Sequence, residues 1–216
     1  MKRLIRTLAL AAASTIAIGV AATSAQAQEV NAQCRQDPTL RKLECGAGAD
    51  TGGPDATAIG DSANAPGANS TAVGSGAQAT GISSTALGSG GTASRTTIAA
   101  AGFSTAIGTG NQVAAGATGG TAVGDNNTVT ASGSFGAAFG AFNTVSGNSA
   151  VAIGNGNRAS GISAVAIGSS SEASGADSIA MGTLALASAE DSVAIGTLAF
   201  AEVSVVRTFG ADRGVD

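Results

Sequence analysis

Residues 148–154 read NSAVAIG, a short run in which small and larger apolar residues alternate before a glycine. The same pattern recurs along the chain as STAVG at 70–74, STALG at 84–88, SAVAIG at 163–168, DSIAMG at 177–182 and DSVAIG at 191–196. From Gly60 to Gly196, the closing glycine returns at intervals of 14, 14, 20, 16, 16, 14, 14, 14 and 14 residues. A period this regular predicts one small unit stacked on copies of itself.

Strict alternation over a few residues indicates a β-strand, in which successive side chains point to opposite faces. Val151 and Ile153 then share one face, and Ala150 and Ala152 share the other. A second alternating run follows each glycine, as in residues 157–161. Two short strands and two turns in each repeat predict an all-β fold, a parallel β-roll of about ten 14-residue coils whose strands lie about 4.8 Å apart.

The two faces of the first strand differ in the size of their side chains. One face is uniformly alanine, which suits a narrow interior, so the larger apolar side chains should point outward. This outward set predicts an interface between copies, and it comprises Ile59, Val73, Leu87, Ile107, Val123, Phe139, Val151, Ile153, Val165, Ile167, Ile179, Met181, Val193 and Ile195. A stripe about 48 Å long and about 10 Å wide covers about 500 Å². That area matches the largest apolar patches on typical monomers, so we expect the chain to self-associate along it.

The first 27 residues have the pattern of a secretory signal peptide. Lys2, Arg3 and Arg6 precede an apolar run, and Ala25-Gln26-Ala27 is a small-residue cleavage site. A membrane anchor is the alternative, but an apolar run of about a dozen residues is short for a bilayer. We therefore expect an exported chain, cell-surface or extracellular, with no membrane-spanning segment after cleavage.

Removing three of the 10 cations leaves 7 against 14 acids, a net charge of −7 for the mature chain. This balance argues against nucleic acid as a partner. Histidine is absent and the carboxylates are scattered, so the sequence predicts no catalytic, cofactor or metal site, and no enzyme. Cys34 and Cys45 are the two cysteines, and in an exported protein we expect them to pair, closing a loop of about 12 residues and contributing about 3 kcal/mol. A two-cysteine metal site lacks further ligands.

The repeats at 148–154 and 192–196, together with the Ala-Ser-Gly run at 159–161, resemble the head repeats of the YadA-like trimeric autotransporter adhesins. The resemblance covers about residues 54–210. It implies a left-handed parallel β-roll, a homotrimer whose Val/Ile sheets face a common axis, and a head outside a bacterial cell that adheres to host matrix or other surfaces. It names no ligand for this chain.

The resemblance also suggests a division of the chain. Residues 1–27 form the signal peptide, 28–53 an N-terminal cap with the disulfide, 54–204 the head repeats, and 205–216 a terminal cap or the start of a neck. The chain ends at Asp216 without sustained heptads or the strands of a membrane barrel. A head-only secreted protein, a truncated product and one part of a larger assembly are the alternatives.

The longer intervals predict insertions in three places: Arg95–Gly102, Gly116–Gly120 and Thr130–Phe135. Insertions in a solenoid map to loops, which can bind ligands or simply be tolerated. Asp177 and Asp191 lie 14 residues apart and should stack on adjacent coils, either as a cation site or as solvated turn residues.

Other functions also fit parts of the sequence. A column of threonines would suit an ice-binding solenoid, and it comprises Thr57, Thr71, Thr85, Thr105 and Thr121. This column has one threonine per coil and then changes to Ala137, Val151, Val165, Ile179 and Val193, which argues against ice binding. A polysaccharide-acting β-helix enzyme would need clustered acids or bases. A non-adhesive secreted scaffold is the remaining alternative.

Overall fold

The computed structural model describes residues 34–89, 96–203 and 207–209, the last three by their backbone alone. These residues belong to one compact unit, Gln33–Asp216, and they form strands and turns without any helix. The expectations for the signal peptide 1–27 and for residues 28–33 and 210–216 concern parts of the chain outside the described residues.

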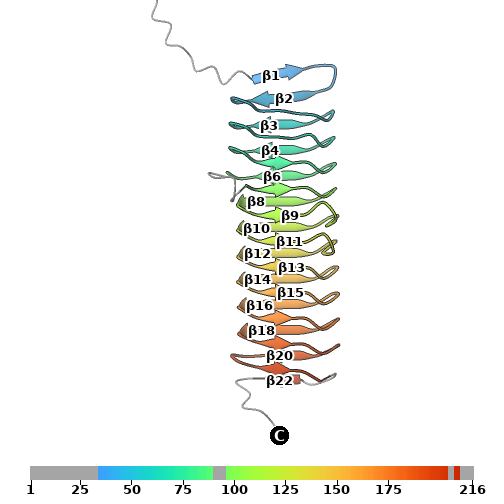
Figure 1. The fold of residues 1–216 in the computed structure, drawn as a ribbon, viewed down its shortest axis with the longest axis vertical. Coiled ribbons are helices and arrows are strands. Elements are labelled where there is room, and N and C mark those ends of the chain that lie inside the picture. The colour runs from blue at the N-terminus through green and yellow to red at the C-terminus, as the bar shows by residue number, and fades with distance from the viewer. Residues whose placement is uncertain (1–33, 90–95, 204–206, 210–216) are drawn as a thin grey trace, which may run out of the picture. The chain divides into compact units, whose positions relative to one another are not determined.

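The strands form two sheets, stacked strand upon strand along the same direction (Figure 1). We call them the long sheet, with thirteen strands, and the short sheet, with nine. The long sheet contains β1 (Cys34–Asp37), β2 (Lys42–Cys45), β3 (Thr57–Ile59), β4 (Thr71–Val73), β6 (Thr85–Leu87), β8 (Thr105–Thr109), β10 (Thr121–Asp125), β12 (Ala137–Ala141), β14 (Val151–Asn155), β16 (Val165–Ser169), β18 (Ile179–Thr183), β20 (Val193–Ile195) and β22 (Arg207–Phe209). The short sheet contains β5 (Gln78–Ala79), β7 (Ile98–Ala99), β9 (Gln112–Val113), β11 (Thr128–Val129), β13 (Thr144–Val145), β15 (Arg158–Ala159), β17 (Glu172–Ala173), β19 (Leu186–Ala187) and β21 (Phe200–Ala201).

Each coil passes once through each sheet, so strands of successive coils pair in parallel. For example, β14 pairs with β16, and Val151, Ala152 and Ile153 lie opposite Val165, Ala166 and Ile167. The fold is therefore the predicted all-β parallel roll, with about eleven turns and a spacing near 14 residues. The hand of the coil, implied only by the resemblance, stays a prediction.

The interior is narrow and filled mainly by alanine. The alanines of the long sheet are fully buried, namely Ala58, Ala72, Ala86, Ala106, Ala122, Ala138, Ala152, Ala166, Ala180 and Ala194. The closing glycine of each repeat lets the backbone turn at very close range to the next coil. Gly154 has φ +121°, and a Cβ there would overlap the carbonyl oxygen of Gly168, so no other residue fits.

Three successive coils hold larger residues inside. Val113, Val129 and Val145 of the short sheet are fully buried, where most other coils have alanine. Opposite them lie Gly120 and Gly136, at positions that carry Ala150 and Ala164 farther along the chain. A Cβ on Gly136 would come within 2.6 Å of Val145 Cγ1. The extra volume of the valines is thus offset by glycine across the interior.

A column of buried asparagines runs along the same part of the interior: Asn111, Asn127, Asn143 and Asn157. Asn127 Nδ2 donates to Asn111 Oδ1 at 2.9 Å and to the carbonyl oxygens of Val123 and Gly140 at 3.1 and 2.7 Å. Asn127 Oδ1 in turn accepts from the backbone N and Nδ2 of Asn143 at 3.1 and 2.9 Å. The column ends at Ser171, whose Oγ donates to Asn157 Oδ1 at 2.7 Å. The amides thereby satisfy carbonyls that the glycine turns leave inside the roll.

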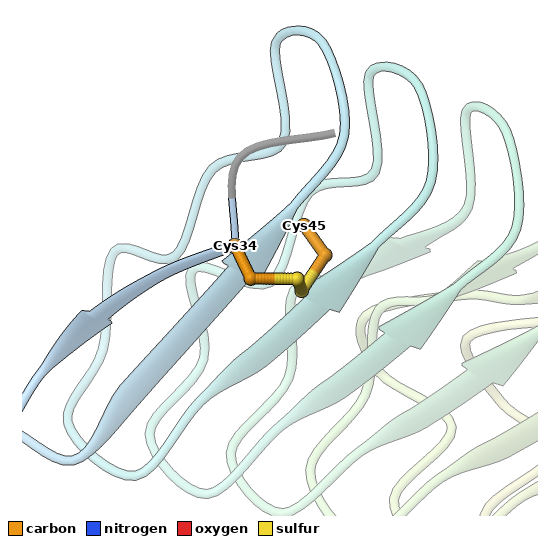
Figure 2. Close-up of a disulfide and its surroundings, with 2 residues drawn as sticks. All are labelled: Cys34 and Cys45. Atoms are coloured by element: carbon orange, nitrogen blue, oxygen red, sulfur yellow. A yellow bond between two sulfur atoms is a disulfide. The ribbon is translucent and has the colours of Figure 1, made fainter. Parts of the chain in front are cut away.

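An antiparallel hairpin of β1 and β2 lies at the first edge of the long sheet, and β2 pairs in parallel with β3. Residues 42–45 are thus already paired as a coil strand, although the sequence places them in the cap segment 28–53. Cys34 and Cys45 lie opposite each other in the hairpin and form a disulfide (Figure 2). The edge strand of the long sheet at this end, β1, is therefore tied to its neighbour by a covalent bond.

Candidate assembly surface

The outward face of the long sheet carries the apolar residues that the sequence predicts as an interface. Ile153 is 38 % exposed and Met181 39 %, whereas Ala152 and Ala180, which alternate with them, are fully buried. The arrangement follows from strand geometry, because a one-residue shift would place isoleucine in an interior that has room only for alanine.

All fourteen predicted interface residues lie in two columns on this face, which we call the apolar face. The strand registers place Ile59 of β3 beside Val73 of β4, and the same column continues to Ile195 of β20. We call it the second column; the first column contains the residue two positions earlier in each strand. Each side chain is half-buried by its neighbours in the column, and the rest of its surface faces away from the roll.

The first column of the apolar face changes in chemistry along the roll. Five threonines stack in register from Thr57 to Thr121, followed by Ala137 and then by valine or isoleucine up to Val193. The coils from β14 to β20 therefore present two aliphatic side chains each, and the earlier coils mostly one. The face becomes more apolar toward the last coils.

The turns at the two ends of each long-sheet strand from β8 to β20 contain a residue in the left-handed backbone region. Glycine, asparagine, aspartate or serine occupies most of these positions, as expected for a positive φ. Five bulky residues depart from that preference: Phe103, Phe135, Phe142, Leu184 and Leu198, with φ between 56° and 58°. Such a conformation costs about 1–3 kcal/mol for a bulky residue. All five side chains are also exposed, by 46 to 68 %.

The two 16-residue coils have their extra residues where the sequence places them. Residues 114–120 and 130–136 connect a short-sheet strand to the next long-sheet strand, a link that spans only 160–164 in a 14-residue coil. In the second turn, Ser132 Oγ donates to the carbonyl oxygen of Ser146 at 2.8 Å. The insertions Gly116–Gly120 and Thr130–Phe135 therefore lie at one corner of the roll.

The prediction of an irregular loop at Arg95–Gly102 is wrong for the residues that the structure describes. Ile98 and Ala99 form β7, which pairs with β5 and β9, and Ala99 is fully buried. The extra length lies earlier, between β6 and β7, and includes residues 90–95 outside the described part. The error arose because a glycine-to-glycine interval gives the length of an insertion without saying which of its two turns contains it.

Charged residues concentrate at the hairpin. Glu44 Oε1 accepts hydrogen bonds from Thr51 Oγ1 and N at 2.6 and 3.1 Å, and Lys42 Nζ donates to the carbonyl oxygen of Thr51 at 2.9 Å. The Thr51 hydroxyl is the main cause that holds the pKa of Glu44 below its ordinary value of 4.5, with Arg35 adding a smaller contribution. Backbone N–H groups of Leu40 and Thr39 similarly lower the pKa of Asp37. These contacts fasten the hairpin to the first coil.

Acidic residues elsewhere are dispersed. Asp177 and Asp191 occupy the same left-handed turn position in successive coils, as their spacing predicts. Within the part of the chain that the structure describes, no three His, Cys, Asp or Glu residues gather closely enough to hold a metal ion. Arg158 and Glu172 form an ion pair of 3.6 Å on the outer side of the short sheet, where both are largely exposed. Among the described residues, no helix is long and apolar enough to cross a membrane.

Together, the repeated coils, the alanine interior and the outward apolar sheet define a parallel β-solenoid repeat protein. Comparison with protein families gives matches to the YadA head domain repeat at residues 52–77, 65–90, 131–157, 159–185 and 173–199. The chain therefore contains a YadA-like head domain, the head type of the trimeric autotransporter adhesins. Heads of this family form trimers and are extracellular. No curated protein matches the chain.

The matches leave out residues 91–130, which include most of the 20-residue interval and the whole of the first 16-residue interval. The structure nevertheless carries both sheets through this region, since β8 pairs with β10 and β7 pairs with β9. The head domain is thus continuous from the first matched repeat to the last.

Proposed function

We propose that the chain is the head of an exported bacterial adhesin and that three copies assemble through the apolar face. The observation that carries the proposal is the uninterrupted second column of the apolar face, from Ile59 to Ile195, which alternates with inward long-sheet positions that are all alanine. Burying each exposed half of an isoleucine or valine contributes about 1 kcal/mol, and the columns repeat this contribution coil after coil. Heads of this family form trimers, which supports three as the number of copies in the assembly.

The assembled head would present its short sheet and turns to the outside. Those surfaces would attach to an extracellular matrix protein or another surface, and the signal-like residues 1–27 would direct export. The corner that carries the insertions 114–120 and 130–136 is the most varied part of this outer surface. It is therefore the first place to look for ligand specificity.

Sedimentation of the full chain tests the assembly. The parent should sediment as a trimer, whereas Ile153→Glu places a carboxylate in the apolar face and should give monomers. Thr144→Glu is the matched control, because Thr144 is a half-buried residue on the outer side of the short sheet. The same acidic residue there should leave the trimer intact. A stable parental monomer would contradict the proposed assembly.

Attachment needs its own measurement. The trimer should bind at least one of a panel of matrix proteins, glycans and bacterial surfaces, with binding reduced in the Ile153→Glu monomer. If the trimer binds none of them, the secreted scaffold becomes the better proposal.

Ice binding is a second candidate, supported by the register of Thr57, Thr71, Thr85, Thr105 and Thr121. It requires the same face to contact ice instead of sister copies. Thermal hysteresis in a solution of the purified chain would favour it over the adhesin.

A further inference from the structure

Three of the chain's six phenylalanines lie on a single coil. Phe139 is in the middle of β12 on the apolar face, Phe135 precedes the strand and Phe142 follows it. Their exposed fractions are 39, 66 and 58 %. We call this coil, residues 135–142, the aromatic coil. Among the described coils it alone has phenylalanine at both end turns.

The neighbouring coils make room for these rings. Phe135 lies over Gly119 of the preceding coil, where an added Cβ would come within 2.8 Å of Phe135 Cδ1. The next coil has Gly156 at the turn position of Phe142. In the aromatic coil itself, the first column of the apolar face holds the small residue Ala137. Two of the rings are also held on left-handed backbone, which disfavours bulky residues. Solvent exposure alone gives no reason to keep large rings at strained positions.

A stack of similar coils raises a problem for assembly. The apolar face repeats every coil, so two copies displaced by one coil, about 4.8 Å, would make nearly the same contacts. Around a rotational axis, one end of a strand meets the opposite end of the corresponding strand in the next copy. A displacement repeated at every contact does not close a ring and leads to open assemblies.

We propose that the aromatic coil holds neighbouring copies of this chain level, with equivalent coils side by side. In this arrangement Phe142 of one copy packs against Phe135 of the next, and Phe139 fills the axis between the copies. This inference rests on the proposed self-association through the apolar face. When copies are level, the two aromatic ends meet. A displacement of one coil instead places Phe142 against Ser149 or Gly119, and Phe135 against Asn126 or Gly156.

The area of the surface agrees with a second copy as its occupant. A stable protein interface covers about 800 Å² on each partner, and the apolar face offers about 500 Å². With about 200 Å² for each phenylalanine, the exposed parts of Phe135 and Phe142, which lie outside the two columns of that face, add about 250 Å². The aromatic coil thus brings the available surface to the size that a specific contact between copies needs.

Cross-linking between copies reports the register directly. Ser163 and Ser170 are at the two ends of the β16 coil, both in left-handed turns. The full chain carrying Ser163→Cys and Ser170→Cys should form disulfides between level copies under mild oxidation. Ser149→Cys with Ser170→Cys should form them only between copies displaced by one coil. Seven residues of extended chain span about 23 Å, so neither pair can close within one copy.

The test variant is Phe135→Ser, Phe139→Ile and Phe142→Ser, which introduces residues found in the same columns at Ser149, Ile153 and Ser170. We expect its ratio of level to displaced cross-links to fall about tenfold or more, and species larger than a trimer to appear in sedimentation. Phe142→Asn is a milder variant, since Asn126 occupies that position one coil earlier, and it should shift the ratio in the same direction. Phe103→Ser is the control, because Phe103 is equally exposed but Gly110 occupies the other end of its coil.

The outcomes separate this inference from the assembly itself. A parental monomer would contradict the proposed function. A parental trimer that forms no level cross-link, or a trimeric phenylalanine variant with an unchanged ratio, would overturn the register role while leaving the assembly in place. A shift equally large in Phe103→Ser would also overturn it, because the effect would then belong to exposed phenylalanine in general.

Discussion

The 16-residue coils around β10 and β12 and the 14-residue coils from β14 to β18 build the same two sheets from different interiors. In the first group valine projects from the short sheet and glycine stands opposite, as with Val129 and Gly120. In the second group alanine occupies both positions, as with Ala159 and Ala164. The distance between the sheets is thus compatible with either solution, provided that the summed side-chain volume stays the same.

The coils also differ in whether a side chain bonds to the carbonyl groups inside the glycine turn. Asn111, Asn127, Asn143 and Asn157 bond to these carbonyls, whereas Ala185 and Ala199 occupy the same position in the last coils. The asparagine column makes each of its coils depend on the next, because every amide bonds across a coil boundary. We expect the coils that carry this column, which include both 16-residue coils and the β14 coil, to be more sensitive to a single substitution than the last coils.

The largest effect should come from Asn127→Ala. The change removes five side-chain hydrogen bonds, three donated and two accepted. It leaves the carbonyl of Gly140 and the N–H of Asn143 without these partners, whereas Asn111 Oδ1 keeps only the backbone N–H of residue 127. Each unsatisfied buried group costs about 1–3 kcal/mol, so the free energy of unfolding should fall by about 3–5 kcal/mol. Urea unfolding followed by circular dichroism measures the change.

Ser171→Ala is the matched control for that substitution, since Ser171 ends the column and bonds only to Asn157 through its side chain. Its cost should be about 1 kcal/mol. Equal losses in the two variants would show that the asparagine column does not couple the coils.

A smaller effect should follow from Gly120→Ala, which adds one methyl group inside a 16-residue coil. The new Cβ would lie 2.9 Å from Val113 Cγ1 and 3.2 Å from Val129 Cγ1, so the free energy of unfolding should fall by about 1–3 kcal/mol. Adding Val113→Ala removes one of these contacts. In a double-mutant cycle the pair should therefore cost less than the sum of the two single changes. Strict additivity would contradict the volume exchange across the interior.

The reverse exchange in a 14-residue coil should have a comparable or slightly smaller effect. Ala159→Val enlarges a fully buried position opposite Ala164, and we expect a loss of about 1–2 kcal/mol. Ala164→Gly in the same chain reproduces the arrangement of the 16-residue coils and should recover part of the loss. Thermal unfolding of the three variants checks this order, and a further loss on adding Ala164→Gly would argue against it.

The sequence predicts the coils well because alternation and period act together over many repeats. Val151 and Ile153 point outward and Ala152 inward as predicted, since an error in one strand would break its register with the next. The sequence did not indicate that the extra residues of the long interval precede β7, because each repeat has two turns and the recurring glycine marks only one of them. The interface role of the apolar face stays a prediction.

Of two features that the sequence analysis missed, only one left a signal in the sequence. Asn111, Asn127, Asn143 and Asn157 each follow a repeat glycine by three residues, so their recurrence could have predicted a buried column. Phe135 and Phe142 were harder to assign, because their importance depends on φ values that the sequence does not reveal. A phenylalanine in a turn is unremarkable until the turn is known to be left-handed.

The smallest effect should arise outside both groups of coils, at the hairpin, through the protonation of Glu44. Its pKa is lower in the folded chain than the ordinary value of 4.5, mainly because of the Thr51 hydroxyl. The hydrogen bond between Glu44 and Thr51 therefore stabilises the folded hairpin above pH 4.5, and this contribution is lost as the pH falls through the lowered pKa of Glu44. We expect it to amount to about 1 kcal/mol or less. The amides of Leu43 and Gly60 bond between β2 and the first coil. Hydrogen exchange at these two amides should accelerate on acidification beyond the intrinsic pH dependence, and Glu44→Gln should abolish most of that change. Glu172→Gln, which removes the exposed partner of Arg158, is the control and should leave exchange at the hairpin unaltered. Hairpin protection that does not depend on pH in the parental chain would mean that Lys42 and the disulfide hold β2 in place without Glu44.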